Sequence, residues 1–149
     1  MSKFIYRMQN LLNIKIELEA QAKNEFAIAN ARLRAQEKIL NALNLQKDGY
    51  EEELKKLYSK NLKIREITET QQAVEVMKYR IRLQILQVKH AQKNVETARL
   101  KLQEVMQERK KHEKLKEKKF EQFLLDEAAD ERKAIDELVS YRHGHKKEE

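Results

Sequence analysis

Apolar side chains recur along the first half of the chain at alternating steps of three and four residues. One row contains Phe26, Leu33, Leu40, Lys47, Leu54 and Asn61, and the other contains Ala22, Ala29, Gln36, Leu43, Tyr50, Leu57 and Ile64. These are the a and d rows of a heptad repeat, the pattern of helices that pair along a narrow seam. The spacing predicts a coiled-coil helix over about residues 3–62.

Upstream of Ala22 the apolar positions continue, but their spacing changes. The seam-like residues there are Phe4, Met8, Leu11, Ile14 and Leu18. From Leu18 through Ala22 to Phe26 there are two successive steps of four. Such a stutter predicts a local unwinding of the supercoil.

The second half of the chain carries a cleaner heptad pattern. One row is Val74, Ile81, Val88, Val95 and Leu102, and the other is Met77, Gln84, Ala91, Ala98 and Val105. The seam positions Arg109, His112 and Lys116 are polar, and the apolar stripe resumes with Phe120, Phe123, Leu124, Ile135 and Leu138. Long Lys and Arg side chains can cover such a seam with their methylene groups. This pattern predicts a second helix over about residues 70–140, followed by a polar tail at 143–149.

The position of the turn follows from where the first rows end. Asp48-Gly49 is a turn dipeptide, but the heptad rows pass through it without a phase change. We therefore expect the turn at about residues 63–70, where Thr68 and Thr70 are poor helix formers and candidate N-caps. The predicted fold is all-α: one long antiparallel two-helix coiled coil, a helical hairpin, that includes the whole chain as a single unit. A parallel dimer of one continuous helix is the competing architecture.

In an antiparallel pair, a rows face d rows. The register that fits a turn at 63–70 places Leu33 by Ala98, Leu40 by Ala91, Leu54 by Met77 and Lys47 by Gln84. It pairs large with small side chains and two polar seam residues with each other, which favours it over its one-heptad neighbours.

Composition agrees with long helices and argues against an enzyme. The chain has no Pro, only 2 Gly and 38% charged residues. With no Cys, no glycine-rich phosphate loop and no metal-ligand spacing among its His residues, we expect no cofactor, no metal and no catalysis. We find no signal-peptide pattern and no apolar run of a membrane-span length of about 20 residues, so a cytoplasmic protein is expected.

Three further features leave alternatives open. The basic stretch at residues 109–119 is either a docking surface for an acidic partner or a solvated helix face. The N-terminal segment with Phe4, Ile5 and Met8 can pack on the second helix, enter a partner's pocket or lie on a membrane. Exposed aromatic side chains near the predicted hairpin tip favour a binding site there; they are Tyr50, Tyr58 and Tyr79. Nucleic-acid binding is not expected, because no base-reading element or stacking aromatic accompanies the basic residues.

Several segments, taken in order, resemble a known family. They are residues 4–12 (FIYRMQNLL), 105–110 (VMQERK), 113–118 (EKLKEK) and 135–142 (IDELVSYR). Together with the length and the two-helix pattern, they resemble the bacterial flagellar export protein family FliJ over nearly the whole chain. Each single motif is ordinary coiled-coil sequence, and the specificity lies in the ordered set.

The resemblance implies a cytoplasmic component of the flagellar type III export apparatus, peripherally associated with the cell membrane at the flagellar base. The implied fold is an antiparallel coiled coil similar to the central stalk of rotary ATPases. The implied partners are the hexameric export ATPase, the membrane export-gate protein FlhA and chaperones of export substrates. The implied role is to couple the ATPase ring to the gate and to help recycle the chaperones.

The resemblance also implies site residues. The patch for the gate protein falls on Ile39, Leu43, Gln46, Tyr50, Ala73, Met77, Arg80 and Gln84. Gln46 and Ala73 depart from the family pattern, which has an aromatic residue at each. Leu43, Tyr50, Met77 and Gln84 also lie on the predicted seam, so packing is an alternative role for them.

The end of the coiled coil that carries both termini is implied to bind the ATPase ring. The candidate residues are Phe4, Met8, Leu11, Ile135, Leu138 and Arg142. The predicted register leaves the second helix extending past the first by about 10–15 residues, and Ile135 to Arg142 is the hypothetical inserting segment. Two other classes stay open: a generic structural or adaptor coiled coil, and a basic protein bound to a membrane or nucleic acid.

Overall fold

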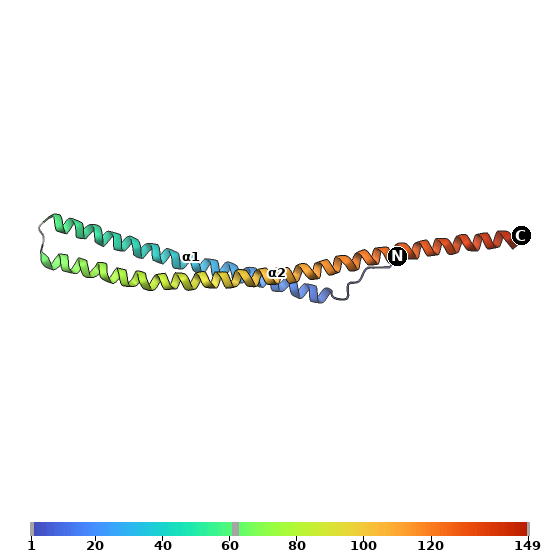
Figure 1. The fold of residues 1–149 in the computed structure, drawn as a ribbon, viewed down its shortest axis with the longest axis horizontal. Helices are drawn as coiled ribbons and strands as arrows, with labels where there is room; N and C mark the ends of the chain where they lie inside the picture. Colours follow the sequence, from blue (N-terminus) through green and yellow to red (C-terminus); the bar gives the residue numbers. More distant parts are fainter. Residues whose placement is uncertain (1, 61–62, 149) are drawn as a thin grey trace. The chain divides into compact units, whose positions relative to one another are not determined.

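The fold is a helical hairpin, and the computed structural model describes residues 2–60 and 63–148, with side chains given for 2–60 and 63–145. Two helices, α1 (Gln9–Ser59) and α2 (Ile64–Glu148), pack against each other and include 94% of the described residues (Figure 1). No described residue belongs to a strand. The all-α prediction is confirmed, and the alternative of one continuous helix is wrong because the chain reverses between Ser59 and Ile64.

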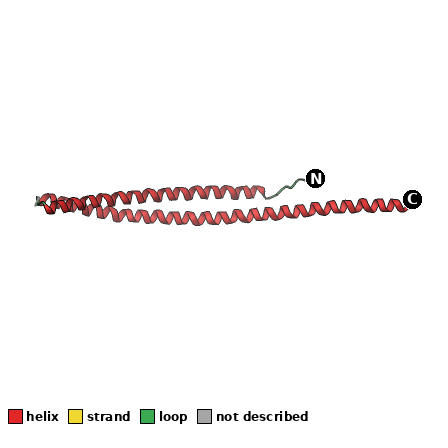
Figure 2. Ribbon diagram, turned by 90° about the horizontal axis from the view of Figure 1, so that it is seen from above, coloured by secondary structure: helices red, strands yellow, loops and turns green. Residues whose placement is uncertain are grey.

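The contacts divide the chain into two compact units. One contains Met1–Glu19 and Glu104–Glu149, and the other contains Ala20–Gln103. Within Ala20–Gln103 the helices lie side by side in opposite directions, and the connection between α1 and α2 closes that hairpin (Figure 2). That the whole chain forms a single domain stays a prediction.

A narrow seam holds the helices of the unit Ala20–Gln103 together. Its buried side chains are Ala22, Leu57, Val74, Met77, Val88 and Ala91. Half-buried residues fill the remaining described a and d positions, including the polar Gln36, Lys47 and Gln84. The heptad rows predicted from the sequence are therefore confirmed here, except that Ile64 is exposed and Asn61 lies outside the described residues.

The seam predicted upstream of Ala22 is wrong at Met8, Ile14 and Leu18, whereas Phe4 and Leu11 are half-buried. Ile14 is 51% exposed and Leu12 only 3%, and Met8 and Leu18 are exposed as well. In the unit that contains Met1–Glu19, the buried or half-buried positions of α1 are Gln9, Leu11, Leu12, Lys15 and Glu19. Leu12, Lys15, Glu19 and Ala22 follow each other by steps of three and four, so no stutter occurs there. Lys15 and Glu19 are tolerated on the seam because both form ion pairs with α2, and their methylene stems cover apolar surface.

The first helix begins at Gln9 rather than at residue 3. The Phe4 ring packs on Phe120 and Phe123 of α2, with centroid distances of 5.1 and 5.4 Å. This contact between aromatic side chains favours a non-helical backbone for residues 2–8. The spacing of apolar residues in the sequence does not reveal such a contact. The first turn of α1 is closed by the Leu12 amide, which donates to the Met8 carbonyl oxygen at 3.0 Å.

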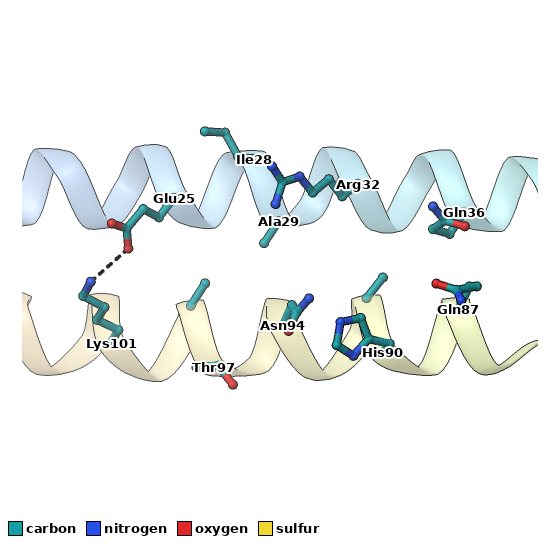
Figure 3. Close-up of a pocket in the computed structure, with 12 residues that line it drawn as sticks. Glu25, Ile28, Ala29, Arg32, Gln36, Gln87, His90, Asn94, Thr97 and Lys101 are labelled. Carbon is teal, nitrogen blue, oxygen red and sulfur yellow. Dashed lines mark hydrogen bonds and ion pairs between the residues drawn. The ribbon is translucent and has the colours of Figure 1, made fainter.

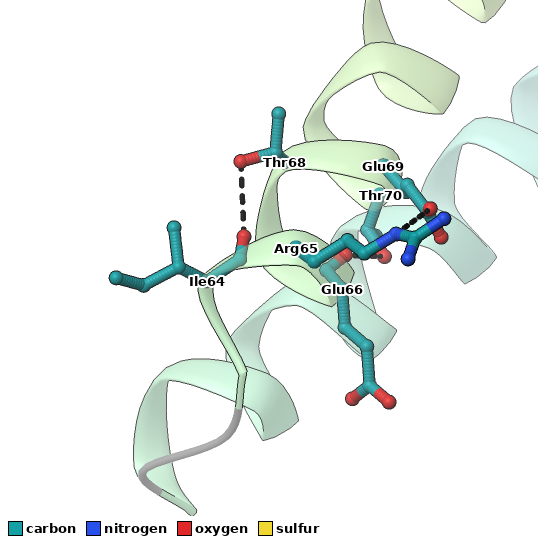
Figure 4. Close-up of polar contacts among 6 residues, drawn as sticks. All are labelled: Ile64, Arg65, Glu66, Thr68, Glu69 and Thr70. Atoms are coloured by element: carbon teal, nitrogen blue, oxygen red, sulfur yellow. Dashed lines mark hydrogen bonds and ion pairs between the residues drawn. The ribbon is translucent and has the colours of Figure 1, made fainter.

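The turn also differs from the prediction, because α2 begins at Ile64. Thr68 and Thr70 are not caps: their hydroxyls donate to the carbonyl oxygens of Ile64 and Glu66 at 2.9 Å (Figure 4). These bonds to the preceding turn allow threonine inside a helix. At the other end, α2 continues to Glu148, so the predicted polar tail is helical where it is described.

The predicted register is wrong by about one heptad. The Gln84 side-chain amide donates to the backbone carbonyl and the side-chain oxygen of Gln36, at 2.9 and 2.7 Å, instead of lying by Lys47. Lys101 forms an ion pair with Glu25 at 3.0 Å in the same register (Figure 3). The shift follows from the earlier turn, because moving a hairpin's turn displaces the pairing by twice that distance. The expectation that polar seam residues face each other is confirmed for Gln84, but its partner is Gln36.

Replacing Gly49 by alanine should stabilise the protein. Gly49 lies inside α1, and a methyl group there would meet nothing within 4 Å. We expect Gly49→Ala to raise the free energy of unfolding by about 0.5–1 kcal/mol, measured by urea denaturation. Gly144→Ala is the comparison, since its site is equally open but lies in the last turns of α2, where a smaller gain is expected. An unchanged or lower free energy of unfolding for Gly49→Ala would contradict the explanation.

Candidate partner-binding surfaces

The eight residues assigned to export-gate binding all lie in the unit Ala20–Gln103, but their exposure differs. Ile39 is 45% exposed, and Gln46 and Arg80 are exposed as well. Met77 is buried at 7%, half-buried seam positions are occupied by Leu43, Tyr50 and Gln84, and Ala73 is half-buried beside the seam residue Val74. Only the three exposed side chains are therefore free of a packing role.

The six residues assigned to ATPase binding lie in the unit with Met1–Glu19 and Glu104–Glu149. Phe4 and Leu11 are half-buried, whereas Met8 is exposed. Ile135, Leu138 and Arg142 are exposed and follow each other on one face of α2. The structure thus separates this set into an N-terminal group, of which Phe4 packs on α2 and Met8 is exposed, and a C-terminal group that faces solvent.

The C-terminal part of α2 is an exposed helix. Every described side chain from residue 128 to residue 145 is exposed, although apolar residues continue through the segment. The predicted inserting segment, Ile135 to Arg142, lies within this exposed part, and it also contains exposed Val139 and Tyr141, which the predicted ATPase-binding set leaves out. The Tyr141 ring stacks on His145 at 5.1 Å. Tyr141 follows Leu138 by three residues, a spacing that could have identified it.

The polar seam positions predicted in α2 are packed against the start of α1. Arg109 donates hydrogen bonds to Glu19 and to Glu113, the latter at 2.7 Å. The Glu19 bond, followed by that of Glu113, raises the pKa of Arg109 above its ordinary value. The guanidinium is therefore charged at any working pH, which the nearly buried Glu19 carboxylate requires.

The two other predicted polar seam residues, His112 and Lys116, are also half-buried. The Lys116 ammonium donates to the Gln9 side-chain oxygen at 2.6 Å, and His112 lies half-buried with its Nε2 atom 3.9 Å from Glu108. The basic stretch at 109–119 accordingly has two faces. One contributes to the seam, and the other is solvated, with exposed lysines such as Lys114.

The surface offers an open groove rather than an enclosed reaction site. In the unit Ala20–Gln103, small seam residues including Ala29 and Ala91 leave a groove of 870 Å³ beside Arg32 and His90 (Figure 3). Among the described residues, no group of three or more His, Cys, Asp or Glu side chains could hold a metal ion. Neither helix, over its described residues, is long and apolar enough to cross a membrane.

Outside the seam, the resolved pKa shifts belong to an exposed ion pair. The hydrogen bond from Arg99, 2.6 Å long, lowers the pKa of Glu96, and the same bond raises the pKa of Arg99. The two residues are three positions apart on α2, so the pair is a local helix contact in solvent. Such pairs contribute little to stability.

A hairpin of paired helices with exposed apolar and charged faces defines the class of coiled-coil interaction proteins. A comparison with known families matches residues 3–148 to the family described as "Flagellar FliJ protein". The chain belongs to this family, which makes it a component of the flagellar protein export apparatus. No curated protein and no solved structure matches the chain.

Removing the Arg109 guanidinium should destabilise the unit that contains the termini. In Arg109→Met, the nearly buried Glu19 carboxylate loses its guanidinium partner, so the thermal midpoint should fall. In the double variant Glu19→Met, Arg109→Met, apolar side chains of similar length replace the pair, and most of the midpoint should return. Both are measured by circular dichroism. A double variant as unstable as the single one would contradict the role given to this pair.

Proposed function

We propose that the protein is a stalk-like coiled coil that couples the hexameric export ATPase to the membrane export gate, FlhA. It acts without catalysis of its own, at the cytoplasmic face of the membrane at the flagellar base, and helps to recycle substrate chaperones. The observation that carries the proposal is the exposed helix from residue 128 to residue 145, which keeps apolar side chains without a partner.

Contact with the ATPase is assigned to the unit that carries both termini. Ile135 and Leu138 supply an apolar face, and Arg142 adds a positive charge on the same side of α2. A single exposed helix can enter a space too narrow for a paired one, because an α-helix with its side chains is about 10–12 Å wide. Phe4, Met8 and Leu11 lie in the same unit, and Met8 is the exposed member available for a contact at the ring entrance.

Contact with the gate protein is assigned to the unit Ala20–Gln103. We assign direct binding to Ile39, Gln46 and Arg80, because these side chains are exposed. The other members of the patch support them from the seam or from beside it: Leu43, Tyr50, Met77 and Gln84 on the seam, and Ala73 next to it. Substitution of a seam residue would therefore affect folding as well as binding.

Loss of the exposed apolar face should weaken ATPase binding at least about tenfold, a free-energy change of about 1.4 kcal/mol. The test variant is Ile135→Gln, Leu138→Gln, and a chain that ends before Ala134 should behave in the same way. Size-exclusion chromatography with light scattering measures co-elution with the cognate export ATPase, together with its ATP hydrolysis. Leu125→Gln is the matched control, because Leu125 is exposed on a different face of α2. Unchanged co-elution of the test variant would remove the proposed contact and favour a generic adaptor.

A charge at position 39 should weaken binding of the gate protein. Ile39→Glu introduces a carboxylate at an exposed site, so the fold should be kept while an apolar contact is lost. We expect at least tenfold weaker binding to the cytoplasmic part of FlhA, measured by titration calorimetry, which corresponds to about 1.4 kcal/mol. The comparison is Leu45→Glu, at another exposed apolar site of α1. Equal effects of the two substitutions would show that the patch has no special role.

A further inference from the structure

Helix α2 carries a second heptad row besides the seam. Each member follows a seam residue by two positions, with steps of three, four, three and four. We call this row the outer stripe; it consists of Val76, Tyr79, Leu83, Leu86 and His90. Two positions along a helix correspond to about 200° of rotation, so the outer stripe faces largely away from α1.

The outer stripe is exposed and apolar. Its first four members are exposed by 47%, 57%, 47% and 60%, and His90 is exposed as well. Isolated exposed apolar residues are normal on any protein, but a regular row of them is the feature that pairs helices. The row is bounded, because the same helical positions hold Gln72 before it and Lys93 after it. The row is about two heptads long, which is enough for a short contact with one other helix.

The residues that flank the outer stripe are basic. In a coiled coil, the positions beside the apolar row select the partner by charge. Here they hold Arg80 on one side and Arg82 and Lys89 on the other, all exposed. The Arg82 guanidinium also lies 5.9 Å from the centroid of the Tyr79 ring, next to the stripe. No Asp or Glu occurs in the chain between Glu75 and Glu96, so this part of α2 has no acidic residue to balance the charge.

We propose that the outer stripe is the docking face for an acidic amphipathic helix of a partner protein, which packs on α2 as a third coiled-coil strand. The apolar row of the partner helix lies on Leu83 and Leu86. Glutamates of the partner helix, beside that row, pair with Arg80, Arg82 and Lys89. The same face of a second copy is an unfavourable occupant, because two identical basic flanks repel each other. The inference does not rest on the proposed function, since no residue of the outer stripe belongs to the gate or ATPase sets and, of its basic flanks, only Arg80 is shared with the gate set.

An anionic membrane is the other surface that attracts basic and apolar residues together. The observations favour a helix, because the row keeps heptad spacing over its whole extent. A membrane-binding helix instead presents a broad apolar sector. On α2 the neighbours of the stripe, Arg80 and Arg82, leave only a narrow row.

The test uses the full chain and a designed peptide of about three heptads, with leucine at a and d and glutamate at e and g. Fluorescence anisotropy should show saturable binding to the unchanged protein. Leu83→Gln, Leu86→Gln should weaken it at least tenfold, and raising the salt concentration should weaken it further. Leu45→Gln, at an exposed apolar site outside the stripe, should bind within twofold of the unchanged protein. Circular dichroism checks that each variant is folded.

Two control ligands and one self-association measurement separate the alternatives. A peptide of the same composition with scrambled leucine spacing should bind at least tenfold more weakly, and equal binding would reduce the effect to charge alone and overturn the proposal. Vesicles with anionic lipid should not bind in a way that depends on Leu83 and Leu86; if they do, and the peptide does not, the face is a membrane surface. Self-association that is lost in the double variant would assign the stripe to a second copy.

Discussion

The structure depends on one interaction, the pairing of two heptad rows along a narrow seam. In the unit Ala20–Gln103 this seam buries a single line of small and medium side chains, such as Ala22, Val74 and Val88. Such a seam places only the a and d residues of each helix in contact, so most of each helix surface remains in solvent. The positions that do not touch the partner helix are then available to other proteins.

Several polar residues are tolerated on the seam because they bond to a partner there. Gln36 and Gln84 bond to each other, and Arg109 bonds to Glu19 and Glu113. An unpaired group at these positions would be destabilising, whereas a paired one fixes which positions can face each other. These pairs therefore help to specify the register, a role that the apolar residues perform poorly because a shift by one heptad again places apolar beside apolar.

Much of the fold could be predicted from the sequence, since the heptad spacing identifies both helices and the seam from Ala22 onward. The errors arose where a local signal competes with a contact that the sequence does not display. Thr68 and Thr70 resemble helix breaks, but their hydroxyls bond within the helix, and the earlier turn displaced the whole register. The row through Ile14 and Leu18 is apolar, yet it does not pack on α2. A different face of α1 does, and its residues Lys15 and Glu19 form ion pairs with α2.

The candidate sites were predictable to a smaller extent, because a residue's type does not show whether its face is covered. Met77 and Ile39 are both apolar members of the gate patch, but only Ile39 is exposed enough for direct contact. The outer stripe was present in the sequence as a second row displaced by two positions from the first. It becomes recognisable only when the seam is known, since α1 can cover one of the two rows and the exposure of Leu83 and Leu86 identifies the other. In a helix that carries two heptad rows, the structural question is therefore which row the chain itself uses, and the remaining row is the one left for a partner.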